Sequence, residues 1–477
     1  MSSILSNNQY RHWRFALANK DRRPAYLMIA DLIAADIESG VLHVRDKLPT
    51  LRELSSMLAL DYTTVARAYK EARERGLIDS SPGAGSYVKG KSVSLSLRGG
   101  TDIEMTMNSP PEPSNPALLD KLNQGFTNIA GSDCITSLLR YQNFGGTYDD
   151  KQAGTTLLSK TLDEPKVECV LACPGTHSVL LGLLSSLATD GMSICVESLV
   201  YPGLKAIAAQ LKVPLVAIDG DSDGPLIYQM EALCKSKDIA AIYLNPTIQN
   251  PTTHTINKAR REAIADIAIR YSIPIIEDDA YGMLPETPTS AIANLAPELT
   301  YYITGLAKYF GAGLRTAYVH APNKASANRL AGAMRALSVM SSPITNKLAT
   351  MWLQDGTVEQ MTSEIRRESQ ARQTLAKTVL QGHKYFAHAD GFHLWIHLPK
   401  SVEVNPSTLA AYLRTQNVSV VSSAAFCTNN NPPHAIRMCL GGPQARWECE
   451  KGLTLITELL ADPEKLTLAL ANKKVRK

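Results

Sequence analysis

The chain has 477 residues, 44% of them hydrophobic and 20% charged, which fits an ordinary soluble globular protein of more than one domain. No apolar run is long enough to span a bilayer, and the start MSSILSNNQYRHWRF lacks the apolar core of a secretory signal. Eight cysteines without a C-x-x-C pair or a histidine cluster favour reduced thiols in a cytoplasmic protein and exclude a metal site. Residues 1–90 hold 13 Lys and Arg against 10 Asp and Glu, and the rest hold 36 against 35, so a modest basic excess indicates an anionic partner at the N-terminal end.

Three stretches near the N-terminus carry apolar residues at the spacing of amphipathic helices. The first is 24–40, the second follows Thr50, which forms a capping box with Glu53, and the third is YTTVARAYKEARERGLI, 62–78. The following IDSSPGAGSYV predicts two short strands around a glycine-rich tip. Three helices and a hairpin predict a winged helix-turn-helix; the alternative is a small helical bundle that serves as a dimer arm.

Residues 26–88 resemble the DNA-binding domain of the GntR regulators, through LPTLREL, the Thr-Val of the third helix and the wing GAGSYV. The resemblance implies double-stranded operator DNA as a partner, with contacts from hydroxyl and guanidinium groups and a close backbone approach at glycines. The residues that it assigns to DNA are Arg52, Tyr62, Thr63, Thr64, Arg67, Gly83, Gly85 and Ser86. Some relatives carry arginine in place of Tyr62 and Ala66, so an operator sequence does not carry over.

Residues 89–113 mix Ser, Gly, Pro and charge without helical periodicity and predict a linker that becomes ordered near MNSPPEP. From about residue 114, helical stretches alternate with short apolar strands, which predicts an α/β domain with a mostly parallel sheet. The expected strands are 169–173, 193–197, 239–244, 273–278 and 300–305. The alternation in GFHLWIHLP predicts a smaller α+β lobe over about 340–470. The expected domains are therefore 1–88, the linker, and 114–477.

Polar residues follow several of these strands, at the edge where open α/β sheets bind ligands. The turn CPGTHS offers backbone N–H groups at the start of a helix, and Tyr201 offers an aromatic ring. Asn250 offers an amide, and IIEDDAYGML offers a carboxylate and a phenol. Lys308, in TGLAKYFGAGLRTAYV, supplies an amine, with Arg315 seven positions later. Taken singly, each motif is also explained by an ordinary loop, and Lys308 by a surface charge.

Together these groups suit pyridoxal 5′-phosphate. Its aldehyde reacts with an amine, its pyridine nitrogen pairs with a carboxylate, and its phenolate oxygen and phosphate accept hydrogen bonds from donors. Residues 114–477 resemble the fold-type I aminotransferases, in which the same motifs occur in this order. The resemblance implies that Lys308 forms the internal aldimine with the cofactor and that Asp278 binds its pyridine nitrogen. It also implies that Asn250 and Tyr281 bind its phenolate oxygen. By the same resemblance, Tyr201 covers the face of the ring, and the cofactor phosphate is bound by Gly175, Thr176, His177 and Arg315. Tyr141 would bind the phosphate of the partner subunit's cofactor, and Arg437 would bind a substrate carboxylate.

The chain departs from that family beside the lysine. Relatives usually have serine or threonine one and three residues before it, where this chain has Ala307 and Gly305, and often proline near Gly311 and Ala312. The two missing hydroxyls predict weaker phosphate binding or an altered environment for Lys308. Any transaminase activity is therefore expected to be weak or a half-reaction.

A GntR-type winged helix followed by an aminotransferase-like domain is the architecture of the MocR regulators, which nearly the whole chain resembles. The resemblance implies a homodimeric transcriptional regulator whose effector domain senses pyridoxal phosphate or an amino compound through an aldimine at Lys308. Two alternatives stay open. One is an active aminotransferase with an attached regulatory DNA-binding domain; the other is a repressor whose large domain only dimerises, which would not need Lys308, Asp278 or Arg315.

Overall fold

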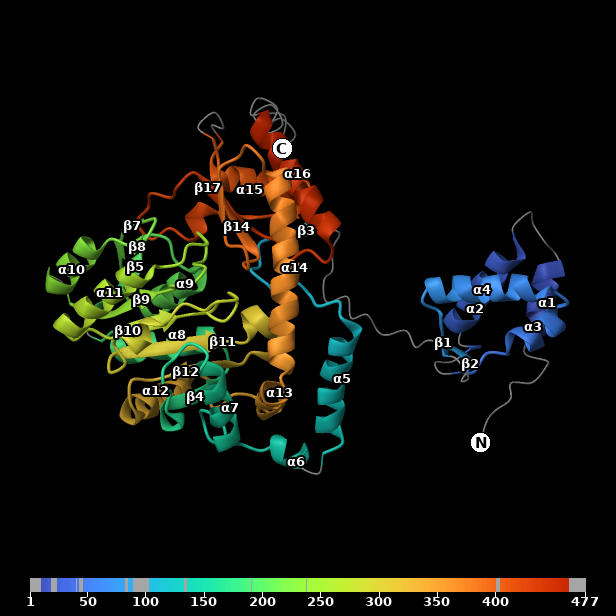
Figure 1. Ribbon diagram of the computed structural model, residues 1–477, viewed down its shortest axis with the longest axis horizontal. Coiled ribbons are helices and arrows are strands. Elements are labelled where there is room, and N and C mark those ends of the chain that lie inside the picture. The colour runs from blue at the N-terminus through green and yellow to red at the C-terminus, as the bar shows by residue number, and fades with distance from the viewer. Residues whose placement is uncertain are drawn as a thin grey trace. The chain divides into compact units, whose positions relative to one another are not determined.

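The computed structural model describes residues 10–18, 24–39, 41–42, 46–81, 85–88, 103–132, 135–189, 191–236, 238–399 and 404–462. The chain divides into two compact units, Met1–Gly100 and Thr101–Lys477 (Figure 1). In the described ranges, no helix has both the length and the apolar character needed to cross a membrane.

The first unit combines helices with a two-stranded hairpin. Its elements are α1 (Arg11–Ala18), α2 (Ala25–Glu38), α3 (Leu51–Leu58), α4 (Tyr62–Glu74), β1 (Ile78–Ser81) and β2 (Gly85–Val88). The strands pair antiparallel, with Ile78 opposite Val88. The predicted capping box of α3 is confirmed, because Thr50 Oγ1 accepts from Glu53 N at 3.3 Å and Glu53 Oε2 accepts from Thr50 N at 2.8 Å. The three expected helices and the hairpin are confirmed as well.

Helix α1 is a fourth helix that the sequence did not predict. Trp13 of this helix is fully buried, and its Nε1 donates to Asp36 Oδ2 of α2 at 2.8 Å. Phe15 of the same helix is 73% exposed. Leu17, four residues after Trp13, packs against the same core, but eight residues are only about two turns and give too short a pattern for periodicity to identify a helix.

The second unit is built on a seven-stranded sheet in the order β4-β12-β11-β10-β9-β5-β6. Its strands are β4 (Val170–Cys173), β5 (Ser193–Glu197), β6 (Leu215–Ile218), β9 (Ile239–Leu244), β10 (Ile275–Asp278), β11 (Thr300–Gly305) and β12 (Ala317–His320). Only β12 runs antiparallel to its neighbours, so the expected α/β class with a mostly parallel sheet is confirmed. The five expected strands are present, and β6 and β12 were not predicted.

Helices cover both faces of this sheet (Figure 1). The helices of this part of the unit are α5 (Pro116–Ala130), α6 (Ile135–Leu138), α7 (Tyr148–Leu158), α8 (Thr176–Leu187), α9 (Pro202–Leu211), α10 (Ile227–Ser236), α11 (Lys258–Tyr271), α12 (Lys324–Ser338) and α13 (Pro343–Gln354), and it also contains the short hairpin β7 (Gly220–Asp221) and β8 (Gly224–Pro225). One core packs α8, α9 and α12 against the sheet, and a second packs α10 and α11 against alternate residues of the same strands. Burial on both faces explains why these strands are continuous apolar runs.

A smaller α+β lobe follows in the chain. It contains an antiparallel sheet in the order β13-β14-β17-β16, formed by β13 (Tyr385–Ala387), β14 (His393–His397), β16 (Val421–Ser422) and β17 (Ala435–Cys439). Its helices are α14 (Thr357–Val379), α15 (Pro406–Thr415) and α16 (Arg446–Ala461). The last part of the predicted linker joins this lobe, because β3 (Ile103–Glu104) pairs in parallel with β15 (Val418–Ser419).

Strand β14 is buried on both faces, whereas the sequence predicted burial at alternate positions only. Leu394 and Ile396 are buried as expected, but the intervening His393 and Trp395 are 0% and 2% exposed. Trp395 packs edge-on against Phe426 at 6.0 Å between ring centroids, and His393 Nδ1 lies 3.3 Å from Asn108 Nδ2. This second buried face is the one that borders the candidate cofactor site.

Candidate functional site

The carboxyl ends of three neighbouring strands, β9, β10 and β11, form the centre of the candidate cofactor site. Asn245 follows β9, and its Nδ2 donates to the carbonyl oxygen of Asp278, the last residue of β10, at 2.7 Å. The backbone N–H of Asn250 in turn donates to Asn245 Oδ1 at 2.9 Å. The structure therefore brings Asn250 and Asp278, far apart in sequence, to one edge of the sheet.

Asp278 is a buried carboxylate with one oxygen occupied and one oxygen open. Tyr243 donates its hydroxyl to Oδ2 at 2.8 Å, while Oδ1 is buried and has no hydrogen-bond partner among the described residues. Burial raises the pKa of Asp278 to about 6, against the lowering effects of the Tyr243 hydrogen bond and of Lys308. Such an oxygen is available to accept a hydrogen bond from a ligand.

Lys308 lies on a π-helical turn, Ala307–Gly311, directly after β11. Its Nζ donates to the carbonyl oxygen of Asn108 at 2.5 Å and lies 5.6 Å from the centre of the Tyr281 ring. Burial lowers the pKa of Lys308 to about 8, and the charge of Arg437 adds to this. The amine is therefore more readily neutral, and nucleophilic, than that of a surface lysine.

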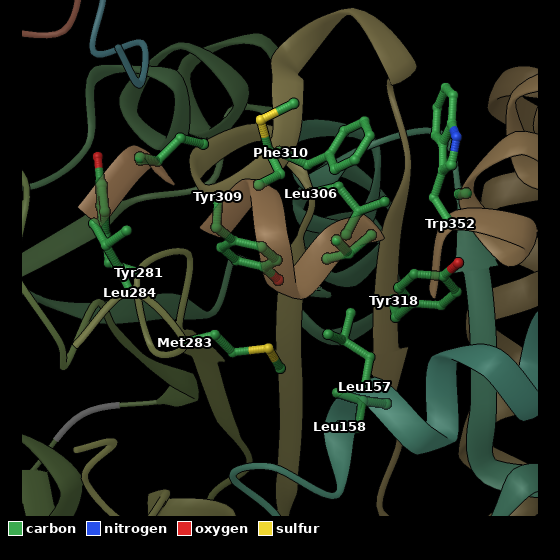
Figure 2. Close-up of a cluster of buried hydrophobic side chains, with 14 of the residues drawn as sticks. Leu157, Leu158, Tyr281, Met283, Leu284, Leu306, Tyr309, Phe310, Tyr318 and Trp352 are labelled. Carbon is green, nitrogen blue, oxygen red and sulfur yellow. The ribbon is translucent and has the colours of Figure 1, made fainter. Parts of the chain in front are cut away.

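The lysine turn is held from behind by a buried apolar cluster. Figure 2 shows Leu306, directly before the turn, and Tyr309 and Phe310 of the turn within this cluster, which also contains Trp352. Phe310 packs against Trp352 at 5.0 Å between ring centroids, and the Tyr309 hydroxyl lies 2.5 Å from Thr304 Oγ1. The neighbours of Lys308 are thus fixed in the core, which fixes the place of the amine.

Tyr281 and Arg437 complete the wall around these groups. The Tyr281 hydroxyl accepts from Asn108 Nδ2 at 2.7 Å, and Tyr281 is 2% exposed. Arg437 of β17 donates from Nη1 to Asn250 Oδ1 at 3.0 Å and from Nη2 to the carbonyl oxygen of Thr106. Its Nε is buried and has no partner in the described part of the chain, and burial lowers the pKa of Arg437.

The four residues predicted to bind a phosphate lie together. Gly175 caps α8 with φ of 89°, and a Cβ placed there would stand 2.9 Å from an Nη atom of Arg315. The start of α8 presents the N–H groups of Thr176 and His177, an arrangement that suits anions. Burial lowers the pKa of His177, and the charge of Arg315 lowers it further.

The missing hydroxyl at position 305 has a replacement in space. A Cβ built on Gly305 would lie 2.7 Å from Thr176 Oγ1, so the threonine hydroxyl of α8 takes the room that a serine side chain would need. A serine at position 305, the last residue of β11, would therefore have to displace the Thr176 hydroxyl, so the absence of a hydroxyl at 305 is matched by the presence of one from α8.

The other two tyrosines predicted for the cofactor site, Tyr201 and Tyr141, lie in different surroundings. Tyr201 is the residue directly before α9. Burial raises the pKa of Tyr201, Asp278 raises it further, and Arg315 and Arg437 lower it. Tyr201 is therefore within electrostatic reach of the site's charged groups. Tyr141 is 86% exposed and is not brought into the site within one chain.

Several residues of the site escaped sequence analysis. They are Tyr243, Asn245 and His393, together with Asn108 in the predicted linker. Tyr243 and His393 lie inside apolar strand patterns, where a polar group is not distinguished from a core residue. The Asn-Pro pair at 245 was visible in NPTIQNPTTH and could have been chosen beside Asn250.

Four of the predicted DNA-binding residues, Tyr62, Thr63, Thr64 and Arg67, lie in the first half of α4. Asp61 caps α4 by accepting from the N–H groups of Thr63 and Thr64 at 3.2 and 3.3 Å. Both threonine hydroxyls also donate to Asp61. Tyr62 is 49% exposed, and the Arg67 guanidinium lies 5.1 Å from the centre of the Tyr26 ring.

The remaining predicted DNA contacts are only partly described. Arg52 is exposed on α3. Gly85 has φ of 101°, and a Cβ there would stand 3.1 Å from Lys47 Cε, so this glycine allows the lysine to lie along the wing. The carbonyl oxygen of Ser86 accepts from Leu48 N at 2.9 Å. Gly83 lies outside the described residues. Lys47, a cation beside the wing, was not predicted.

Comparison with known proteins assigns both units to families. Residues 103–448 match the family described as aminotransferase class I and II, and residues 25–88 match the gntR family of bacterial regulatory proteins. The chain therefore belongs to the aminotransferase class I and II family and carries a gntR-family domain in front of it. That combination is the MocR architecture, and the protein is a helix-turn-helix transcriptional regulator of this class.

Individual relatives agree with this assignment. The HTH-type transcriptional regulator YdeF of Bacillus subtilis (strain 168) is 30% identical over 451 residues, which cover 93% of this chain and 96% of YdeF. PtsJ of Salmonella typhimurium, a vitamin B6 salvage pathway transcriptional repressor, is 24% identical over 392 residues, covering 80% of this chain and 87% of PtsJ. The solved structure of LysN, the α-aminoadipate aminotransferase of Thermus thermophilus, has a TM-score of 0.69 at 19% identity, covering 83% of this chain and 99% of LysN.

Proposed function

We propose that this regulator binds pyridoxal 5′-phosphate at Lys308 and senses the cofactor or an amino compound there. Its affinity for operator DNA changes in response. The observation that carries the proposal is the open oxygen of Asp278. A buried carboxylate oxygen without a partner among the described residues costs free energy unless a ligand donates to it. A protonated pyridine nitrogen is such a donor, and it would also favour the ionised form of this carboxyl.

The other residues around Asp278 fit the same cofactor. When bound, pyridoxal phosphate supplies an aldehyde that reacts with amines and a ring that withdraws electrons. Lys308 offers an amine with a pKa of about 8, and Tyr281 offers its hydroxyl proton to the phenolate oxygen. Gly175, Thr176, His177 and Arg315 would hold the phosphate at the start of α8. Tyr201, within electrostatic reach of Asp278 and Arg315, would lie against the ring.

Arg437 points to the chemistry of the effector. A buried guanidinium with an unpartnered Nε among the described residues suits a carboxylate, which accepts two parallel hydrogen bonds. We therefore expect an amino compound that carries a carboxylate, with pyridoxal phosphate itself as the other candidate signal. The name of PtsJ, a vitamin B6 salvage repressor, supports the second candidate for that relative.

A homodimer is the expected assembly, and Tyr141 supports it. A tyrosine that is 86% exposed leaves a large ring in water unless another surface covers it. Its hydroxyl would reach the phosphate of the partner subunit. Each winged unit would contact one half of an operator in double-stranded DNA, with α4 in the major groove. The place of action is then the cytoplasm.

An active aminotransferase is the second candidate, and the buried Lys308, Asp278 and Tyr281 support it. A lysine with a pKa of about 8 can accept a proton near neutral pH, as a catalytic base must. Many turnovers with an amino acid and a keto acid would favour this candidate. A single half-reaction without turnover would leave the regulator as the function.

The direct test is the visible absorbance of the purified full chain after addition of pyridoxal phosphate. The wild type is expected to turn yellow and keep its colour through gel filtration, and Lys308→Ala is expected to stay colourless. Lys324→Ala, at the exposed start of α12, is the control because this lysine is a surface residue outside the set assigned to the cofactor. A colourless wild type would contradict the proposal, and a yellow Lys308→Ala would contradict the role of this lysine.

A further inference from the structure

A turn of the small lobe, Ser423–Cys427, lies against the large domain beside α9, and we call it the seat. Val200 N donates to the carbonyl oxygen of Phe426 in the seat at 3.0 Å. Next to this bond, Leu199 forms an isolated antiparallel bridge with the last residue of the seat. The seat therefore joins the small lobe to the large domain at the residues directly before Tyr201, which we assign to the cofactor ring.

Lys205 of α9 holds the seat with its ammonium group. Its Nζ donates to the carbonyl oxygens of Ala425 at 3.0 Å, Cys427 at 2.5 Å and Ala424 at 3.5 Å. Three acceptors match the three N–H bonds of a lysine, and hydrogen bonds from a charged donor are stronger than those between neutral groups. Lys205 therefore fixes the backbone on both sides of Phe426.

The side chain of Phe426 supports the arginine that we assign to an effector carboxylate. Arg437 Cζ lies 5.3 Å from the centre of the Phe426 ring, and Phe426 is 0% exposed. Trp395 packs edge-on against the same ring at 6.0 Å between centroids. The negative face of an aromatic ring attracts a cation, most strongly where water is excluded. This contact uses the face of the guanidinium and leaves the N–H groups at its edge for hydrogen bonds.

Phe426 thus connects two groups of the proposed site, one in each lobe. Its carbonyl oxygen holds the backbone next to Tyr201, and its ring holds Arg437. We propose that Lys205 is a positioning residue for this site: by fixing the seat, it sets Tyr201 against the cofactor ring and Arg437 toward the effector carboxylate. The inference rests on the proposed function. Groups that bind a ligand need such support to keep their geometry.

The test removes the charge of Lys205 without changing a residue assigned to a ligand. Lys205→Met keeps the apolar stem and loses the donors, whereas Lys205→Arg keeps a cation with several donors. Absorbance titration of the full chain with pyridoxal phosphate is expected to show about threefold to tenfold weaker binding by Lys205→Met than by the wild type, and recovery to within about twofold in Lys205→Arg. Lys212→Met, exposed at the end of the same helix, is the control and should match the wild type.

Circular dichroism separates positioning from stability. The visible signal of the bound chromophore, measured per mole bound at saturation, reports the asymmetric surroundings of its ring. This signal is expected to change in Lys205→Met and to return to the wild-type value in Lys205→Arg, because Tyr201 follows the seat. A lower melting temperature with an unchanged signal would show that Lys205 only holds the two lobes together.

Phe426→Leu tests the connection to Arg437. Leucine keeps the position apolar but removes the aromatic face, so the guanidinium is held less firmly. Burial and the charge of Arg437 lower the pKa of Lys308 to about 8, while Cys439 and Asp278 raise it. Because the neutral amine is the reactive form, the rate at which the yellow colour develops rises with pH around this pKa. A looser Arg437 should move the midpoint of that pH profile upward.

The outcomes separate this role from the proposed function. Phe386→Leu, at a position 50% exposed, is expected to keep the wild-type midpoint. An unchanged midpoint in Phe426→Leu, or unchanged affinity and dichroism in Lys205→Met, would overturn the positioning role while the wild type is yellow. A wild type that stays colourless at every pH would instead overturn the proposed function on which this role rests.

Discussion

The two units hold their functional groups in opposite surroundings. In the winged unit, the candidate DNA contacts lie on the surface, with Tyr62 49% exposed and Arg67 exposed above the ring of Tyr26. In the second unit, Asp278 and Arg437 are each 4% exposed, and burial shifts the pKa of both. Water satisfies exposed groups until DNA replaces it. Buried groups must be satisfied by the protein or by a ligand.

This difference has a consequence for stability. The surface contacts of the winged unit can be changed with little effect on folding, because water replaces whatever is lost. The buried contacts of the second unit link ligand binding to folding, since an unpaired buried group destabilises the protein that lacks its ligand. Substitutions at the exposed contacts of the winged unit are therefore expected to change binding alone, and substitutions at the buried contacts of the second unit are expected to change both binding and stability.

Asp278→Asn is expected to have the largest effect on the cofactor. Loss of the charged acceptor should weaken binding of pyridoxal phosphate by about 10–100-fold, because a hydrogen bond to a charged group contributes ~1.5–3 kcal/mol. The cofactor-free variant should at the same time be more stable than the wild type at pH 7. Absorbance titration and thermal unfolding of the same samples check the two effects.

The pH dependence of this stability follows from the sign of the shift. The pKa of Asp278 is raised from 3.8 to about 6 by burial, so the folded protein keeps a proton that the unfolded chain has already released. The free energy of unfolding therefore falls as the pH rises from about 4 to about 6, by up to ~3 kcal/mol from this group. Asp278→Asn should remove this fall. An unchanged pH profile would place the carboxylate in a more solvated setting.

Gly305→Ser restores a side chain that is usual in relatives and is expected to harm this chain. Its Cβ would stand 2.7 Å from Thr176 Oγ1, and overpacking of this kind costs about 1–3 kcal/mol. Thermal unfolding should show the loss, and pairing the substitution with Thr176→Ala should recover most of it. Gly311→Ser in the same turn is the control, because a Cβ there meets nothing within 4 Å.

Arg67→Ala tests the exposed unit. Operator affinity is expected to fall by ~1–2 kcal/mol, with the melting temperature unchanged, because the guanidinium is on the surface. If Arg67 contacts a phosphate, the salt dependence of binding should also decrease by about one counterion. Arg73→Ala, near the other end of α4, is the matched control. A loss of folding stability in Arg67→Ala would show that its contact with Tyr26 is structural.

Thr50→Ala is expected to have the smallest effect. It removes the side-chain cap of α3, which should lower the stability of the winged unit by about 1 kcal/mol without affecting cofactor binding. Ser56→Ala, exposed on the same helix, should be neutral. Separate unfolding transitions, read by calorimetry, would assign the change to the first unit. A shift in both transitions would show that the units unfold together.

The sequence predicted best those features that repeat along the chain or follow strand ends. The helix period located α2, α3 and α4, and the strand-end motifs located Asp278, Lys308 and Asn250. It could not predict groups that act on the site from a distant segment. Tyr243 looks like a core residue of an apolar strand, and Asn108 looks like part of a linker, yet one binds Asp278 and the other Tyr281. Partners of this kind are set by the packing of the sheet against the small lobe.

Coupling between the cofactor site and DNA is the central claim. The most direct measurement is the affinity of the full chain for a DNA fragment selected by this protein from a random pool, titrated with and without pyridoxal phosphate. We expect the cofactor to change the affinity of the wild type by at least several-fold and to leave Lys308→Ala unchanged. Equal affinities for the wild type in both titrations, with the yellow colour present, would contradict coupling and leave a cofactor-binding domain that does not regulate DNA.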